Sequence, residues 1–150
     1  MNENINSQAT ATTFKIQKIY LKSIIFQTPN KFFTSNNKWD PKLNMHVHTQ
    51  SNAVAGKDNV FDVDLIIKIM VLSDGIEVFN SETCQSGIFT IESTEEKDSL
   101  RTQHTLCPTI LFPYAQESIS SVVTKSGFPQ LCIAPINFNV LYEKNKAKIK

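Results

Sequence analysis

The sequence predicts an α+β fold, in which a four-stranded antiparallel sheet carries two helices on one face. Apolar residues occupy every second position in several stretches of the first two thirds of the chain, as in half-buried strands. A helical pattern of apolar residues follows only after Pro113. The 150 residues fit one domain with a core of its own.

The first segments predict a tail and a long strand. Residues 2–13 are small and polar without periodicity, so we expect residues 1–13 to form a disordered N-terminal tail ahead of the folded domain, residues 14–142. Apolar residues occupy both odd and even positions in the stretch from Phe14 to Phe26, so they would point to both faces of a regular strand. A strand with a bulge, or one covered on both faces, accounts for that pattern.

Two more strands and a hairpin are expected next. A short strand follows from the alternation of Leu43, Met45 and Val47 with polar residues. Residues 61–71 alternate most regularly, with six apolar residues on one parity: Phe61, Val63, Leu65, Ile67, Ile69 and Val71. Asp74 and Gly75 suit a tight turn, so this strand should pair with residues 76–83.

The last third predicts the helices. Residues 92–105 are polar and charged and are interpreted as a surface crossover. A first helix should begin after Pro113 and stop near Lys125, with Gly127 just beyond it. Asn137 can cap a second helix with Phe138, Leu141 and Tyr142 on one face. Residues 143–150 are expected to be a basic C-terminal tail or a frayed helix end.

Composition favours a cytoplasmic protein without a redox or membrane role. The sequence has no signal-like segment and no apolar run long enough to span a membrane, so no membrane insertion is expected. Its three cysteines lack the spacing of a zinc knuckle or a disulfide framework. The net charge is +1, with ten acidic residues against three lysines between Lys57 and Asp98 and a lysine-rich end. No nucleic-acid reader motif accompanies those lysines, so nucleic acid is not an expected partner.

No catalytic residue, cofactor or metal is predicted. His46 with His48, and His104 with Cys107, form pairs too small for a zinc site, which needs three or four protein ligands. Serine, aspartate and histidine are all present, but no motif places them together.

The run from residue 106 to 142 resembles the signature of the SecB family, tetrameric bacterial chaperones that hold preproteins unfolded for export. Seven motif segments carry the resemblance: Cys107-Pro108, Ile110 to Ala115, Glu117, Gly127, Phe128 to Leu131, Ala134-Pro135 and Asn137-Phe138. Upstream segments follow in the family's order: Phe14 to Tyr20, Pro29-Asn30, Trp39 to Pro41 and Gly87 to Phe89.

The resemblance implies an ATP-independent holdase that binds unfolded preproteins. Binding without a sequence code requires exposed apolar and aromatic surface. We expect five residues to line the client-binding groove: Trp39, Phe79, Leu131, Leu141 and Tyr142. The alternative for any one aromatic is a place in the core, and a small-ligand site in the sheet-helix cleft is a further alternative.

The resemblance also implies a homotetramer, a dimer of dimers with the first helix buried between the dimers. The interface residues expected on that helix are Ser118, Ser121 and Val122. A solvated serine face on a monomeric helix is the alternative reading. Ser81, Thr83 and Gln85 occupy positions that the family associates with assembly, so their polarity is expected to affect the dimer-tetramer balance.

The family's partner is the SecA translocase ATPase, whose basic tail docks on an acidic surface of the sheet. The matching positions here are Ser23, Gln27, Asn80 and Glu82, and only Glu82 is acidic. We therefore expect weakened docking, since the lost charges reduce affinity and association rate together. The alternative function is a SecB-like chaperone uncoupled from SecA that serves general clients or a dedicated client such as an antitoxin.

Overall fold

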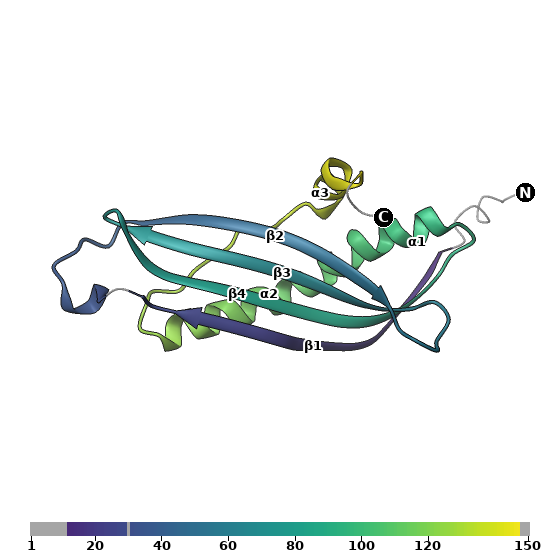
Figure 1. Cartoon of the computed structure of the whole chain (residues 1–150), viewed down its shortest axis with the longest axis horizontal. Coiled ribbons are helices and arrows are strands. Elements are labelled where there is room, and N and C mark those ends of the chain that lie inside the picture. The colour runs from purple at the N-terminus through teal and green to yellow at the C-terminus, as the bar shows by residue number, and fades with distance from the viewer. Residues whose placement is uncertain (1–11, 30, 148–150) are drawn as a thin grey trace, which may run out of the picture.

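A computed structural model describes residues 12–29 and 31–147 of the chain. Within them, one antiparallel sheet has the strand order β1-β4-β3-β2 (Figure 1). Its strands are β1 (Thr13–Gln27), β2 (Pro41–Ala53), β3 (Val60–Ser73) and β4 (Ile76–Glu92). The helices are the 3-10 turn η2 (Phe32–Thr34) and the α-helices α1 (Glu96–His104), α2 (Leu106–Lys125) and α3 (Phe138–Asn145).

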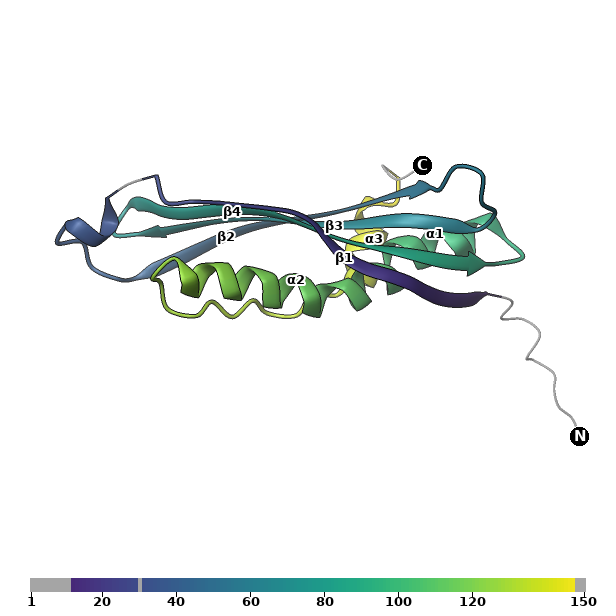
Figure 2. The ribbon, with the colours of Figure 1, turned by 90° about the horizontal axis from the view of Figure 1, so that it is seen from below.

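The helices lie on one side of the sheet, which confirms the predicted fold class. α2 runs beneath the sheet and packs on β3 and β4 (Figure 2). α1 precedes it along the same side, and α3 packs against both α1 and α2. The opposite face of the sheet is covered by none of the described elements (Figure 2).

β3 supplies the centre of the core, as its alternation predicts. Its apolar side chains at every second position, Val63, Leu65, Ile67, Ile69 and Val71, are each at most 2% exposed. They join buried residues of β4 and α2 in one apolar cluster. Burial of this single face orients the whole sheet toward α2, because shifting the register by one residue would expose all of these side chains.

β1 contains the irregularity that its mixed parity predicts. The pairing of β1 with β4 slips between Ile16 and Lys18 and again between Leu21 and Ser23. Each bulge reverses which residues face the helices. As a result, apolar residues of both parities face the helix side along this one strand.

The turn between β3 and β4 is also as predicted. Asp74 and Gly75 both have positive φ, 57° and 77°, which aspartate tolerates and glycine favours. β4 then continues without a break to Glu92, well beyond the expected end at Thr83. Gly87 lies inside it, where a Cβ would come within 2.8 Å of the Phe89 ring and 3.1 Å of Leu111 Cδ2, so the missing side chain leaves room for both core side chains.

The expected crossover at residues 92–105 is wrong, because residues Glu96–His104 form α1. This helix lacks an apolar stripe and is attached through polar side chains. Gln103 and His104 are buried, and they pair with Ser51 and Thr49 of β2. The acidic side chains of Glu96 and Asp98 in its first turn stabilise the helix, because they interact favourably with the positive end of the helix dipole.

The expected start of the next helix after Pro113 is wrong as well. α2 begins at Leu106 and contains Pro113 in its interior. A proline there costs about 3 kcal/mol in an isolated helix, but the preceding turns bury Cys107, Leu111 and Phe112 in the core, which offsets that cost. The helix ends at Lys125, and Gly127 follows with a φ of 94°, as predicted.

α3 begins where the sequence predicts. The Asn137 Oδ1 accepts hydrogen bonds from the backbone N–H groups of Asn139 and Val140, both at 3.1 Å. Phe138 and Tyr142 point inward, 2% and 8% exposed. Most of the expected N-terminal tail and the last three residues of the expected C-terminal tail lie outside the described residues, so both boundaries stay predictions.

Candidate binding surface

An aromatic cluster lies at one end of the sheet and includes residues of the loop between β1 and β2, which we call the crossover loop. It consists of Phe32, Phe33, Trp39, Phe79 and Phe128. Phe128 is the centre, with its ring 4.7 Å from Phe33, 4.9 Å from Phe79 and 5.9 Å from Trp39 between centroids. Phe33 is 59% exposed and Trp39 is 37% exposed. The cluster therefore offers aromatic surface to solvent above a buried base.

The crossover loop is held in place by Ser73 at the end of β3. The Ser73 hydroxyl donates a hydrogen bond to the carbonyl oxygen of Lys38 at 2.5 Å and accepts one from the N–H of Asp40 at 2.7 Å. Ser73 is 1% exposed, so water cannot readily replace either bond. These two bonds bracket Trp39 and fix its position against the cluster.

A row of apolar side chains continues from the cluster along β2, consisting of Leu43, Met45 and Val47. They share the helix-facing side because successive strand residues alternate between faces. Met45 and Val47 are partly buried against the core, and Leu43 is 40% exposed. We call these three residues the β2 row.

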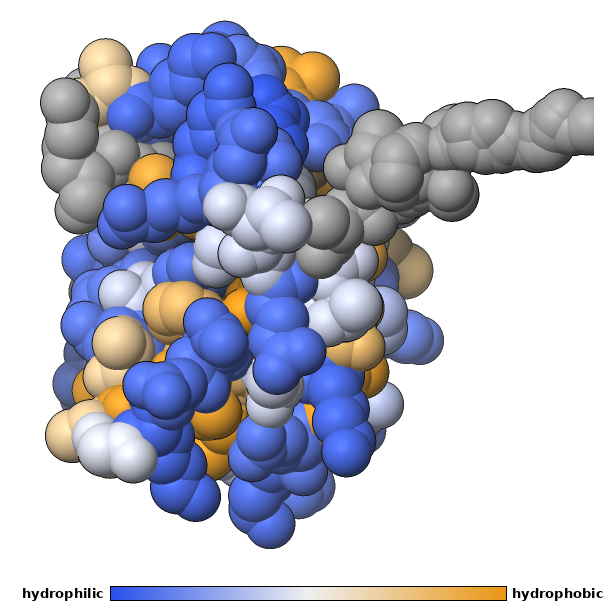
Figure 3. All heavy atoms as spheres, turned by 90° about the vertical axis from the view of Figure 1, so that its right-hand side faces the viewer, coloured by the Kyte–Doolittle hydropathy of each residue, from blue (hydrophilic) through white to orange (hydrophobic). Residues whose placement is uncertain are grey.

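The β2 row leads to a hollow of about 260 Å³ beside α3. Its lining consists of Val47, His48, Thr49, His104, Leu141, Tyr142 and Asn145. Cluster, row and hollow together trace an apolar path on the helix side of β2. By contrast, the end of the molecule that carries α1 and the turn after β2 presents mostly hydrophilic side chains (Figure 3).

Among the groove residues that the sequence suggests, Trp39 and Leu141 lie on this path. Leu131 lies elsewhere, in a surface hollow next to α2 that also contains Ser121 and Cys132. Phe79 is 1% exposed and stacks on Phe26 at 5.0 Å, so its ring supports the cluster from the core. An accessible Phe79 is therefore wrong for this chain as folded: its β4 position faces α2 and not solvent.

Tyr142 is also mostly buried, at 8% exposed, and two residues of α1 contact its ring. The Arg101 guanidinium lies 4.9 Å from the ring centroid, and the His104 ring is stacked on it with centroids 6.2 Å apart. Arg101 also pairs with Glu143 of α3. Tyr142 thus fixes α3 to α1, and little of its surface is left exposed in the hollow.

His104 connects this joint to the sheet. Its Nδ1 lies 2.7 Å from Thr49 Oγ1 of β2. Burial lowers the pKa of His104, and the neighbouring His48 lowers it further. The imidazole therefore stays neutral at neutral pH, where it can share one hydrogen bond with the threonine hydroxyl.

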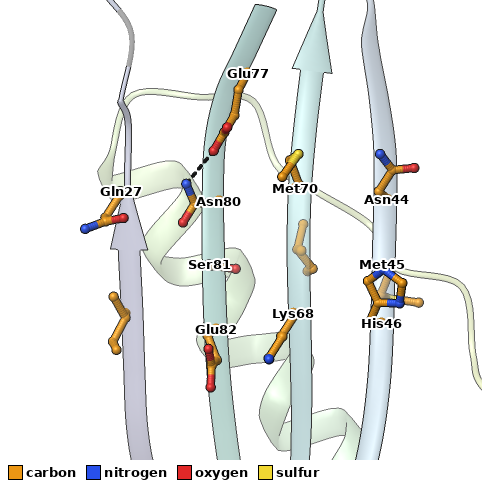
Figure 4. A pocket seen from close by; sticks show the side chains of 12 residues that line it. Gln27, Asn44, Met45, His46, Lys68, Met70, Glu77, Asn80, Ser81 and Glu82 are labelled. Atoms are coloured by element: carbon orange, nitrogen blue, oxygen red, sulfur yellow. Dashed lines mark hydrogen bonds between the residues drawn. The ribbon is translucent and has the colours of Figure 1, made fainter.

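Three of the four positions matched to SecA docking, Gln27, Asn80 and Glu82, lie together on the opposite, open face of the sheet (Figure 4), and the fourth, Ser23, follows from the register on the same face. Gln27 and Asn80 are direct partners across β1 and β4, and Glu82 pairs in register with Ile25. Three of the four positions, all but Ser23, line a hollow of about 570 Å³. The shared face follows from the sheet register, but nothing in this geometry adds acidic charge beyond Glu77 and Glu82.

A polar network that the sequence did not reveal lies further along the same open face. The Lys22 ammonium is 2.9 Å from Asp64 and 3.6 Å from Asp62, and the Tyr20 hydroxyl donates to Asp62 at 2.9 Å. Ser86 donates to Asp64 at 2.6 Å.

The hydrogen bond to Asp64 raises the pKa of Lys22, and burial raises that of Tyr20. The alternation of β3 shows that both aspartates share a face, but only the bulge before Ser23 places Lys22 beside them.

The three residues expected at a tetramer interface lie on partly exposed turns of α2. Ser118 lines a hollow between α2 and β1, which also contains Leu21 and Tyr114, 43% and 50% exposed. Beneath α2, three buried side-chain oxygens have no hydrogen-bond partner among the described residues: Ser81 Oγ, Thr83 Oγ1 and Gln85 Oε1. An interface in this region stays a prediction.

Within residues 12–29 and 31–147, no group of three or more histidine, cysteine, aspartate or glutamate residues is placed to hold a metal ion. The described helices include none that is long and apolar enough to span a bilayer. Burial raises the pKa of the Cys107 thiol, which makes it a core residue of low reactivity.

Comparison with known proteins gives one consistent result. A family model described as preprotein translocase subunit SecB matches residues 7–149. The protein-export protein SecB of Legionella pneumophila (strain Corby) is 38% identical over 149 residues, covering 96% of this chain and 91% of the relative. That of Methylococcus capsulatus is 38% identical over 136 residues, covering 91% and 86%. A SecB-like chaperone of Mycobacterium tuberculosis, solved in complex with a peptide from an antitoxin, superposes with a TM-score of 0.69 at 12% identity, covering 87% of this chain and 94% of that one.

Proposed function

Since the chain belongs to the SecB family, we propose that it is an ATP-independent chaperone that binds unfolded preproteins and keeps them competent for export by the Sec translocase. A protein that binds only non-native chains slows their folding by mass action and needs no chemical step. A cytosolic location, where preproteins are made, and the absence of enzymatic activity are part of the proposal.

The observation that carries this proposal is the apolar path on the helix side of β2. Exposed aromatic rings of Phe33 and Trp39 continue into the β2 row and end at Leu141. Such a path supplies contact area to any apolar segment without reading its sequence. Ser73 holds the aromatic end in place, so binding does not have to order the loop first.

Delivery to SecA is the second part of the proposal. We propose that the open face around Gln27, Asn80 and Glu82 docks the translocase, as the family's matching positions do, with lower affinity because Ser23, Gln27 and Asn80 are uncharged. The same three residues favour the alternative, a chaperone uncoupled from SecA. The antitoxin peptide in the M. tuberculosis structure is compatible with a dedicated client of that kind.

A homotetramer is also part of the proposal. The exposed apolar surface of Leu21 and Tyr114, which line a hollow together with Ser118, supports a further contact in this region. Ser118, Ser121 and Val122 would then lie between dimers, and small serine side chains permit close helix approach. Sedimentation of the protein, compared with that of a variant carrying Ser118→Arg and Ser121→Arg, tests the interface.

The function itself is tested by refolding a slow-folding preprotein with and without stoichiometric amounts of the protein. We expect slower refolding and a complex on gel filtration, with no change on addition of ATP. Unchanged refolding together with no complex would contradict the holdase. Titration with a peptide of the basic SecA tail then separates the two variants of the function: no binding favours the uncoupled chaperone.

A further inference from the structure

We propose that the free edge of β2 takes up extended client segments in which apolar and acidic residues alternate. This inference rests on the proposed function, because it specifies which segments the same surface prefers. It follows from the edge of the strand and from the different side chains on its two faces.

The edge is available to a further strand ahead of the stretch from Val47 to Thr49, which shares a hollow with α3. Among the described residues, β2 is hydrogen-bonded on one side only, to β3. Alternate residues of the strand therefore present backbone donors and acceptors along its outer side. An extended peptide that pairs with such an edge gains main-chain hydrogen bonds whatever its sequence.

Side chains of an added strand would alternate between the two faces of the sheet. On the helix side they would lie next to the β2 row, Leu43, Met45 and Val47, between the aromatic cluster and the hollow beside α3. Apolar residues are favoured there because they extend a surface that is already partly buried.

On the open face the neighbours are polar or positively charged. β2 presents Lys42, Asn44, His46 and His48 there, all exposed, and none of its residues is acidic. Behind His46 lies Lys68, its register partner on β3. Figure 4 shows His46 and Asn44 on the outermost strand with Lys68 and Met70 beside them.

The acidic residues of this face lie further away from that stretch of the edge. Asp62 and Asp64 pair in register with Asn52 and Gln50, at the other end of β2, and both contact Lys22. Glu82 lies two strands inward, opposite Lys68. Glutamate or aspartate on an added strand would thus meet Lys42 and the histidine N–H donors first. Opposite charges on directly adjacent strands are favourable and like charges are unfavourable.

The test compares two peptides that differ only in charge: one alternates valine or leucine with glutamate, and the other has lysine in place of glutamate. At low salt we expect the acidic peptide to bind about tenfold more tightly, and the difference to shrink with added salt. N-methylation of the alternate amides that face β2 should abolish binding, whereas N-methylation of the other set should not. Equal binding of the two peptides, or tighter binding of the basic one, would overturn the proposal.

Charge reversal locates the preference on β2. Lys42→Glu and Lys68→Glu should each weaken the acidic peptide about fivefold and strengthen the basic one. Lys15→Glu is the matched control, since Lys15 is exposed on β1 at the opposite edge of the sheet. Loss of affinity in the control equal to that in Lys42→Glu would show a bulk charge effect and contradict the assignment.

Two further measurements separate this inference from the proposed function. A urea-unfolded preprotein of balanced charge tests the holdase: if it binds but the peptides show no preference, only the inference fails, and if it does not bind, the proposed function fails. A single-stranded oligodeoxynucleotide tests the other anionic partner. Displacement of the acidic peptide by equimolar oligonucleotide would mean that the surface takes up nucleic acid, and the proposal would be wrong.

Discussion

The ring of Tyr142 is stacked on that of His104, with centroids 6.2 Å apart and planes inclined by 19°. This contact joins α3 to the end of α1, and the hydrogen bond between His104 and Thr49 of β2 joins α1 to the sheet. Tyr142, whose aromatic ring would suit a client-binding surface, thus serves mainly to hold α3 beside that surface. The position of Leu141, and with it the hollow at the end of the apolar path, depends on this joint.

Replacing Tyr142 by alanine should destabilise the fold. The ring is 8% exposed and contacts His104 and Arg101, so its loss should cost about 3 kcal/mol of unfolding free energy, at the low end for a buried aromatic. Urea denaturation measures the change. Val140→Ala on the same helix is the control, since Val140 is 53% exposed and its loss should cost about 0.5 kcal/mol or less. Equal effects would contradict the joint.

Replacing Phe33 by alanine should affect client binding more than stability. Phe33 is 59% exposed, so its truncation removes contact area for clients but little of the core. We expect client affinity to fall by about 1 kcal/mol or more, with an unfolding free energy lowered by less than that. Leu106→Ala, at a residue 42% exposed on α2, is the control that should leave affinity unchanged. Titration of a fluorescent unfolded client measures the affinity, and urea denaturation measures the unfolding free energy.

Replacing Ser73 by alanine should loosen the aromatic cluster from beneath. The change leaves the Asp40 N–H and the Lys38 carbonyl without their buried partner, at a cost of about 1–3 kcal/mol. Client affinity should fall as well, because Trp39 between these two residues is no longer held. Ser23→Ala, at an exposed serine of β1 away from the loop, controls for loss of a hydroxyl. Unchanged stability and affinity would show that the loop is held by other contacts.

Stability should decrease as the solution is acidified through the range in which histidine titrates. The folded pKa of His104 is lowered by burial, so its neutral form is favoured in the native state. Its contribution is therefore fully present above the unfolded pKa, about 6.5, and is lost as the pH falls below that value. Urea unfolding between pH 8 and pH 5 measures the slope, which should be reduced in His104→Gln and retained in His46→Gln, a change at an exposed residue.

Adding acidic side chains at the docking positions should strengthen binding of the basic SecA tail. Ser23→Asp, Gln27→Glu and Asn80→Glu place three charges beside Glu82 on the open face. Each exposed pair is worth about 0.2–1 kcal/mol, so the triple variant should bind severalfold more tightly at low salt. Calorimetric titration against the tail peptide measures the gain. An equal gain from Ser35→Asp, outside the sheet, would show a general charge effect.

Local chemistry was sufficient to predict much of the scaffold. The regular alternation of β3 is tied to a single buried face, Asp74-Gly75 can adopt the positive φ angles of the turn, and Asn137 carries the side-chain acceptor that a helix start requires. In each case the determining interaction lies within a few residues of the chain. The family signature between residues 106 and 142, and with it the class of function, is also contained in the order of the residues.

Tertiary contacts decided the rest. α1 has no apolar stripe and is held by hydrogen bonds to β2, which no local pattern reveals. α2 includes Pro113 because the core contacts of Leu111 and Phe112 outweigh the lost backbone bond. The accessibility of each aromatic likewise depends on partners far away in sequence: α1 covers Tyr142 and Phe128 covers Phe79, whereas Trp39 and Phe33 keep open surface. Residue type determines what a side chain can bind, but only the packing of distant segments determines whether it is free to do so.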